Sequence, residues 1–144
     1  MSIGLALYNI LVANNAITSK VASWVLTGTT YYAIFDLSLI PASMPTTNGT
    51  KTFTVQDTTL NFYRSGIIDG GEVSIDTTYT LNCRAYTQDD AEALQTACYN
   101  ALNRVLSADG QQQFVCRLLE TIKPLDSADN YNAVIELRVR AKQL

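Results

Sequence analysis

Residues 77–106 read TTYTLNCRAYTQDDAEALQTACYNALNRVL, and this stretch combines a strand pattern with a helix pattern. In its first part Tyr79, Leu81, Cys83 and Ala85 alternate with polar residues. Such alternation is the period-two pattern of a strand that has one buried face and one solvated face. A helical period follows immediately, so we predict a strand that leads directly into a helix.

The predicted helix begins with a capping box at residues 87–90. The hydroxyl of Thr87 can accept a hydrogen bond from a first-turn amide, and Asp89 and Asp90 complement the positive end of the helix dipole. The apolar residues that follow recur at spacings of three and four and form one stripe: Ala91, Leu94, Cys98, Ala101, Leu102 and Val105. Because the linker is so short, the helix must fold back over the apolar face of the strand. The stretch therefore predicts the nucleus of a two-layer domain.

The composition indicates one globular domain over residues 1–144. The chain is 47% hydrophobic but only 16% charged, so its surface is either polar without charge or covered by partners. Its formal net charge is −3, and no lysine or arginine cluster occurs. A protein that grips nucleic acid needs cations against the phosphates, so the composition disfavours DNA or RNA binding. DNA can pass such a surface without being held.

The first residues and the cysteines indicate a soluble protein in a reducing compartment. The segment MSIGLALYNILVA is apolar, but it lacks a basic n-region and is too short to span a bilayer. We therefore expect no membrane partner and no export. Cys83, Cys98 and Cys116 each fall on the apolar phase of a predicted element. They are expected to be buried thiols, because the chain has no histidine and no clustered zinc ligands.

In the N-terminal part, the pattern predicts two helices and a strand. The first helix covers residues 2–13, and a short second turn or helix ends at Gly28. Residues 31–37 are rich in aromatic and branched side chains and predict a strand. Residues 38–50 contain two prolines and little periodicity, which predicts a long loop. Such a loop is either a functional contact or a connection of no consequence.

The remaining elements are predicted to be strands. Residues 51–64 form either one long strand with a bulge near Gln56 or two short strands. The glycine-rich residues 65–71 are the predicted turn of an antiparallel hairpin with the central strand. Residues 113–122 and 131–142 complete the set, and the second of these has the cleanest alternation in the chain.

The predicted fold class is therefore α+β, with a mainly antiparallel four- to five-stranded sheet and two helices packed on one face. The other face is left wet or becomes a subunit interface. Its polar and charged residues are our candidate interface residues: Asn82, Arg84, Glu136, Arg138 and Arg140. Their arginines can pair with carboxylates of a neighbouring subunit. They can equally form an ordinary solvated face, where exposed ion pairs are worth only about 0–1 kcal/mol.

No catalytic, cofactor or metal site emerges from the sequence, and we expect no enzyme. The chain contains no histidine, the commonest general base. The glycines at residues 66–71 precede no helix, so they do not form a phosphate-binding loop. Asp126, Asp129 and Asn130 have the spacing of no calcium loop and are explained as turn residues.

The order of these elements and several local strings resemble the tail terminator, or tail completion, proteins of long-tailed bacteriophages. The members of this family are minor tail proteins that take part in joining the head to the tail. The helix string is IGLALYNILVA, the irregular segment is LIPASMP, and TLNFYRSG precedes the glycine-rich turn. The strand-to-helix unit is YTLNCRAYTQDDAEALQTACYNALNRV, and PLDSADNYNAVIELRVRA contains the closing loop and strand. The resemblance covers nearly the whole chain, but its motifs are architectural and none is catalytic.

The resemblance implies a virion structural protein that assembles in the host bacterial cytoplasm into a ring, usually of six copies. The ring caps the head-proximal end of the tail tube, stops its polymerisation and provides the head-docking surface. Its partners are other copies of itself, the tail tube protein and the head-completion or connector protein, while DNA passes through the lumen without specific binding. Alternatives are another head-tail neck component, such as a head-closure or adaptor ring, and a small cytoplasmic binding module.

Two loop regions are the candidate contacts of such a ring with its partners. They are the 38–50 segment and the tip of the predicted hairpin, both expected to be exposed. The residues in question are Pro41, Met44, Pro45, Ile67, Ile68 and Asp69.

Overall fold

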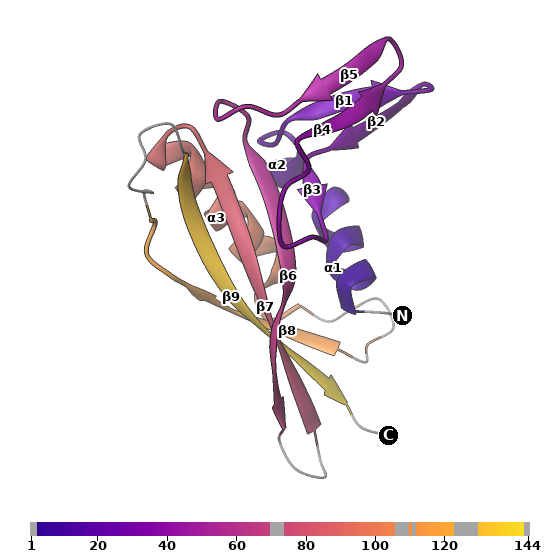
Figure 1. The fold of residues 1–144 in the computed structure, drawn as a ribbon. Helices are drawn as coiled ribbons and strands as arrows, with labels where there is room; N and C mark the ends of the chain where they lie inside the picture. The colour runs from indigo at the N-terminus through magenta and orange to yellow at the C-terminus, as the bar shows by residue number, and fades with distance from the viewer. Residues whose placement is uncertain (1–2, 70–73, 106–109, 111, 123–129, 143–144) are drawn as a thin grey trace.

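A computed structural model describes residues 3–69, 74–105, 110, 112–122 and 130–142 of the chain. Within these ranges the chain is an α+β domain (Figure 1). Its elements are, in order, α1 (Ile3–Val12), α2 (Asn15–Thr18), β1 (Ser23–Leu26), β2 (Thr29–Tyr32), β3 (Ile34–Phe35), β4 (Ser43–Thr46), β5 (Gly49–Thr52), β6 (Thr59–Asp69), β7 (Ser74–Ala85), α3 (Gln88–Leu102), β8 (Gln112–Leu118) and β9 (Tyr131–Lys142). None of the described helices has the length and apolar character needed to cross a membrane.

The central sheet has five strands in the order β3-β6-β7-β9-β8. β6, β7, β9 and β8 pair with their neighbours in antiparallel fashion, whereas β3 pairs with β6 in parallel through Ile34↔Leu60 and Phe35↔Asn61. The predicted α+β class is confirmed, but the sheet is mixed and two small hairpin sheets accompany it. A strand of two residues carries too little periodicity for its direction to be predicted.

The predicted strand-to-helix unit, β7 followed by α3, forms the centre of the domain. β7 buries Tyr79, Leu81, Cys83 and Ala85 on one face. Thr87 has the extended backbone of an N-cap, and its hydroxyl accepts a hydrogen bond from the Asp90 amide at 3.2 Å. The strand and the helix are thus separated by only a short turn, and α3 packs back on β7 and β9.

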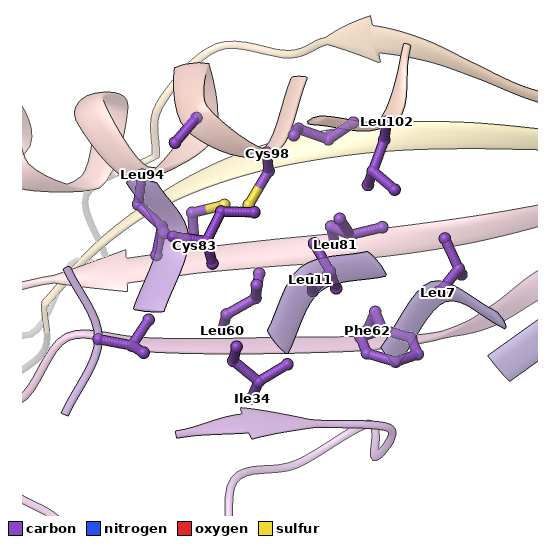
Figure 2. Close-up of a cluster of buried hydrophobic side chains, with 14 of the residues drawn as sticks. Leu7, Leu11, Ile34, Leu60, Phe62, Leu81, Cys83, Leu94, Cys98 and Leu102 are labelled. Atoms are coloured by element: carbon purple, nitrogen blue, oxygen red, sulfur yellow. The ribbon is translucent and has the colours of Figure 1, made fainter. Parts of the chain in front are cut away.

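The hydrophobic core lies between the sheet and the helices α1 and α3 (Figure 2). Figure 2 shows side chains of both helices directed toward those of the central strands. The fully buried members are Leu7 and Leu11 of α1, Leu94, Cys98 and Leu102 of α3, Leu60 and Phe62 of β6, and Leu81 and Cys83 of β7. The apolar stripe and the alternation predicted from the sequence therefore meet in one core.

The predicted second helix is wrong beyond Thr18. Asn14, which was expected to end the first helix, caps the short α2 by accepting a hydrogen bond from the Ala16 amide at 2.9 Å. Residues 23–26 form β1, which pairs with β2. The indole of Trp24 stacks on Phe35 at 6.2 Å and meets Phe53 edge-on at 5.7 Å. These aromatic contacts outweigh a weak helical rhythm.

The 31–37 strand and the 38–50 loop also differ from prediction. The predicted strand is divided between β2 and β3, with Ala33 between them. The predicted loop contains β4 and the start of β5, which form a hairpin through Thr46↔Gly49. Gly49 has a φ of +152°, a conformation that side chains rarely adopt, so glycine permits this turn.

Residues 51–69 form two strands, which was one of the two alternatives for this region. β5 ends at Thr52 and β6 begins at Thr59. The alternative of one long strand with a bulge near Gln56 is therefore not the one that forms, and the irregularity in the long hairpin falls between Arg64 and Gly66. Residues 65–69 continue β6 and are not a turn. The ends of β6 and β7 extend beyond the layer of helices in Figure 1.

The closing elements are close to prediction where the structure describes them. β9 matches the predicted strand, and β8 ends four residues before Ile122, which forms an isolated bridge with Asn132. Several predicted features lie outside the described residues: the glycines of the predicted turn at 70 and 71, Asp126 and Asp129.

The outer edge of β8 is partly occupied by the chain that follows α3. The Arg104 amide donates to the Phe114 carbonyl at 2.7 Å, and the Phe114 amide donates to the Val105 carbonyl at 3.0 Å. The Cys116 amide donates to the side-chain oxygen of Asn103 at 3.0 Å. This arrangement shields an edge that would otherwise accept a foreign strand.

Cys83 and Cys98 are buried free thiols, and Cys116 is a half-buried one. The hydrogen bond with Cys98, together with burial, raises the pKa of Cys83 well above its ordinary value. Burial raises the pKa of Cys116 to about 12. Folding therefore disfavours both thiolates, and stability that is complete below the ordinary thiol pKa should be lost as the pH rises through the folded values.

We expect iodoacetamide to alkylate these thiols slowly in the folded protein at pH 8. The thiolate fraction of Cys116 there is lower than that of an ordinary cysteine by roughly a thousandfold, and the thiolate is the nucleophile. Site-resolved mass spectrometry of the folded and urea-unfolded protein measures the effect. The rate at Cys116 should rise about tenfold per pH unit between pH 8 and pH 10. Equal rates in the folded and unfolded protein would contradict the buried arrangement.

Candidate interaction surface

The sheet face opposite the helices carries the candidate interface residues in cross-strand rows. Strand register places Thr59, Arg84 and Asn132 in one row and Asn61 beside Asn82 in the next. Further along come Glu136 opposite Thr80, Arg138 opposite Thr78, and Arg140 opposite Asp76. Because side chains alternate between faces, these residues point away from the helix-covered core.

The predicted interface residues do not form one site. Six positions along β7 separate Arg84 from Thr78, the partner of Arg138, which corresponds to about 20 Å of strand. Arg138 and Arg140 are exposed at that far end. Glu136 lies between them and Arg84, and its carboxylate is 3.7 Å from the Arg117 guanidinium in a largely exposed pair. The structure therefore groups only Asn82 and Arg84 together.

The end of this face near Arg84 is buried, so the expectation of a wet Asn82 is wrong. Asn82 is only 6% exposed, and its side-chain oxygen accepts a hydrogen bond from Asn132 Nδ2 at 3.0 Å. Asn61 is fully buried. Its Nδ2 donates to the carbonyls of Leu37 at 3.0 Å and Ser38 at 3.3 Å. These bonds hold the segment after β3 against the sheet, where the prediction had a face that is either wet or a subunit interface.

Four buried polar atoms at this end have no hydrogen-bond partner within the described chain. They are Thr59 Oγ1, Asn61 Oδ1, Arg84 Nε and Asn132 Oδ1, which we call the polar cluster. Buried polar groups are nearly always paired, and an unpaired one destabilises a protein by about 1–3 kcal/mol. Four such atoms in two adjacent rows therefore mark a polar part of the sheet whose hydrogen-bonding capacity the described residues leave unused.

A hollow of about 330 Å³ opens beside the polar cluster. We call it the Arg84 hollow. Arg84 and Thr59 line it together with Asn130, which directly precedes β9, and with the segments on either side of the β4–β5 hairpin: Ile40, Pro41, Ala42, Phe53, Thr54, Val55 and Asp57. A guanidinium, a hydroxyl and apolar walls in one depression are suited to binding a polar group carried on an apolar segment.

The charge balance of the Arg84 hollow is positive. Asp57 lies 2.9 Å from Lys51 Nζ, and its other oxygen accepts from the Thr54 amide at 2.8 Å. Burial by itself raises the pKa of Asp57, but the hydrogen bonds from Thr54 and Lys51 and the charge of Lys51 outweigh it and lower the pKa. That carboxylate is thus already neutralised locally. The Arg84 charge remains to attract an anion.

The two small hairpins are tied to each other, and the second of them connects the segments that line this hollow. The Thr47 amide donates to the Val25 carbonyl at 2.8 Å, and the Thr27 amide donates to Thr47 Oγ1 at 3.0 Å, so β1–β2 and β4–β5 are tied together. Trp24 and Phe53 join both hairpins to the core. The adjoining segment presents Leu37 at 51% exposure and Leu39 at 76% exposure. Exposed apolar residues beside a hollow are typical of contact surfaces.

The structure places the residues of the two candidate contact loops in different environments. Pro41 lines the Arg84 hollow, so the structure brings a predicted contact residue to a predicted interface residue. Met44 is half-buried against the core, and Pro45 is exposed in β4 opposite Thr50. The backbones of Ile67, Ile68 and Asp69 belong to β6, opposite Thr77, Asp76 and Ile75, and their side chains lie outside the described part of the structure.

Sequence reasoning missed Thr59 and Asn61 as site residues. A signal was present, because they alternate with the buried Leu60 and Phe62 and therefore share the face of Asn82. The chemistry they offer is binding: hydroxyl, amide and guanidinium groups arranged around a depression. Among the described residues no three histidine, cysteine, aspartate or glutamate side chains are grouped to hold a metal ion.

Comparison with known proteins supports the fold along its whole length. The structure is similar to a chain of a solved virion of a native gene transfer agent particle, with a TM-score of 0.59 and 16% sequence identity. The match covers 99% of this chain and 96% of the other. No protein-family model matches the sequence, and no curated protein does.

Proposed function

We propose that this chain is a virion structural protein that forms a ring, of six copies, at the head-proximal end of a phage tail tube. In that position the ring ends tube polymerisation and offers the surface on which the head docks. The observation that carries the proposal is the fold likeness to a chain of a virion particle, which covers nearly all of both chains. The resemblance of the local strings to tail terminator proteins points in the same direction.

The geometry of the chain supports a role in assembly. The sheet face opposite the helices ends in a polar cluster without partners, and a hollow with excess positive charge lies beside it. A heterologous ring contact joins two different patches of the same subunit, so a depression on one face can receive a projection from the other side of the next copy. The long β6–β7 hairpin extends beyond the layer of helices (Figure 1) and is the part best placed to reach another ring.

Termination in this proposal is a matter of surface shape. One face of the ring matches the end of the tube, while the other face lacks the surface that would accept the next tube ring. The negative net charge of −3 suits a ring around a channel through which DNA slides, because a wall that attracts phosphates would retain it. A ring that binds one end of a tube is then sufficient to stop the addition of tube subunits at that end.

A tube-capping assay tests this function. The tail tube protein of the same virion is allowed to polymerise with and without the purified chain, and electron micrographs give the tube lengths and the occupancy of each end. We expect shorter tubes at amounts of the chain well below equimolar, with added density at one end only. An unchanged length distribution and bare ends at both sides would overturn the proposal.

The same assay separates a neck adaptor from a tail terminator. Binding to the head connector complex alone, with tubes that grow as before, would identify a head-closure or adaptor ring. Binding to tubes and to the connector together is the result expected for the proposed function.

A further inference from the structure

We propose that the Arg84 hollow is an intersubunit site in which Arg84 binds an exposed carboxylate of the next copy of this chain. The inference rests on the proposed ring and deepens it, because it names the groups that join neighbouring subunits. Three observations carry it: the unpaired buried atoms of the polar cluster, the hollow beside them, and the local neutralisation of Asp57 by Lys51, which leaves Arg84 as the uncompensated charge.

Two members of the polar cluster, Arg84 Nε and Thr59 Oγ1, can donate to a carboxylate, whereas Asn61 Oδ1 and Asn132 Oδ1 are acceptors. Arg84 Nε lacks a partner among the described residues, so once the side chain turns outward, Nε and one terminal nitrogen of the guanidinium can donate two parallel hydrogen bonds. A carboxylate accepts this pair in planar geometry, which is the strongest contact arginine makes in proteins. Thr59 is 3% exposed, and its unpaired hydroxyl lines the same hollow and can donate a third bond.

A second copy of the chain supplies such a group. The chain carries more acidic than basic residues, 13 against 10, and the described part of the chain presents exposed carboxylates outside the hollow: Asp36, Asp89, Asp90 and Glu120. A heterologous ring contact joins two different surface patches of identical subunits. The exposed carboxylates would form one of these patches, and the Arg84 hollow would form the other. The apolar walls at Ile40 and Phe53 would be covered by the same contact.

Arg84 Nε is shielded within the isolated chain, so its side chain turns outward when the neighbour docks. The backbone does not need to move, because β7 is hydrogen-bonded to β6 on one side and to β9 on the other. The exchange is favourable since a buried unpaired N–H of a charged group gains a charge-assisted hydrogen bond.

The dilution stability of the assembled ring tests the inference. Light scattering over a concentration series compares the wild-type chain, Arg84→Gln, Arg84→Lys and the control Lys20→Gln. The control removes the same charge from an exposed site outside the Arg84 hollow. We expect Arg84→Gln to raise the concentration at which rings dissociate by at least tenfold, Arg84→Lys to raise it less because it keeps the charge, and Lys20→Gln to leave it unchanged.

A second variant, Thr59→Val, keeps the test decisive if Arg84 substitutions disturb folding. It replaces an unpaired buried hydroxyl by a methyl group of similar size, so thermal unfolding of the monomer should be unimpaired while the ring dissociates at several-fold higher concentration. Rings of Arg84→Gln and Thr59→Val that persist to the same dilution as wild type would overturn the inference and leave the proposed ring intact. Failure of the wild-type chain to assemble would overturn both.

Charge reversal identifies the carboxylate. Arg84→Glu should abolish rings, and combining it in turn with Asp36→Lys, Asp89→Lys, Asp90→Lys or Glu120→Lys should restore them in one combination. Restoration in one combination supports the pairing, whereas loss of rings in all four contradicts it.

Discussion

Leu81→Ala should lower the free energy of unfolding by about 2–5 kcal/mol, the largest effect we expect from a single substitution. Leu81 is fully buried in the middle of β7. Its row in the sheet contains Phe62 of β6 and Ile135 of β9, and Figure 2 shows it between side chains of α3 and of α1. Removal of its branched end loses apolar burial and leaves a cavity that the two helices cannot collapse to fill.

Urea unfolding followed by circular dichroism measures this loss. The matched control is Thr80→Ala, the adjacent residue of β7, which is half-buried on the opposite face. It should change the free energy of unfolding by about 0.5 kcal/mol or less. Similar losses for both variants would contradict the assignment of the core to the helix-covered face alone.

Gln95→Leu should destabilise the fold by about 2 kcal/mol, because it removes two hydrogen bonds to backbone carbonyls. The Val134 carbonyl keeps the Leu119 amide at 3.0 Å, whereas the Leu119 carbonyl loses its Gln95 donor. Gln95 is 7% exposed on α3, and its Nε2 donates to the Leu119 carbonyl at 3.1 Å and the Val134 carbonyl at 2.8 Å. One amide thus joins the helix to β9 and to the chain that follows β8. A leucine of similar size fills the space but supplies no donor.

Gln88→Leu is the matched control, since it makes the same chemical change at an exposed position of the same helix. Gln88 contacts only Glu92 among the described side-chain hydrogen bonds, at 2.9 Å within one helical turn. Its loss should cost about 0.5 kcal/mol or less. Differential scanning calorimetry compares the two variants, and an equal fall in Tm would show that the buried bridge has no special role.

The parts of the fold that were predictable are those in which one local period extends over many residues. β7, α3 and β9 were predicted nearly to their ends, because the alternation around Leu81, the capping box at Thr87 and the alternation around Leu137 are complete within each segment. Their pairing followed from the need to bury one apolar face against another.

The N-terminal strands were not predictable because tertiary contacts decide them. Trp24 follows a weak helical rhythm in sequence, yet its ring packs on Phe35 and Phe53, residues that lie 11 and 29 positions away. β3 contains two residues, and the β4–β5 hairpin contains Pro45, a residue that argues against a strand. Sequence spacing alone carries no trace of these contacts.

The candidate site was predictable only in outline. Alternation placed Asn82 and Arg84 on the face opposite the core, which the register confirms. The burial of that end and the Arg84 hollow depend on the segment held by Asn61 through the Leu37 and Ser38 carbonyls, more than 20 positions away in sequence. No local sequence pattern predicts such a long-range contact.

Negative-stain electron microscopy of the purified chain shows whether it forms a ring. We expect particles with the outline of a closed ring of six subunits around a central hole, and we expect the wild-type ring to persist on dilution further than that of Arg84→Gln. Single small particles at every concentration, both alone and with the tail tube protein present, would contradict the claim that this chain works as a ring.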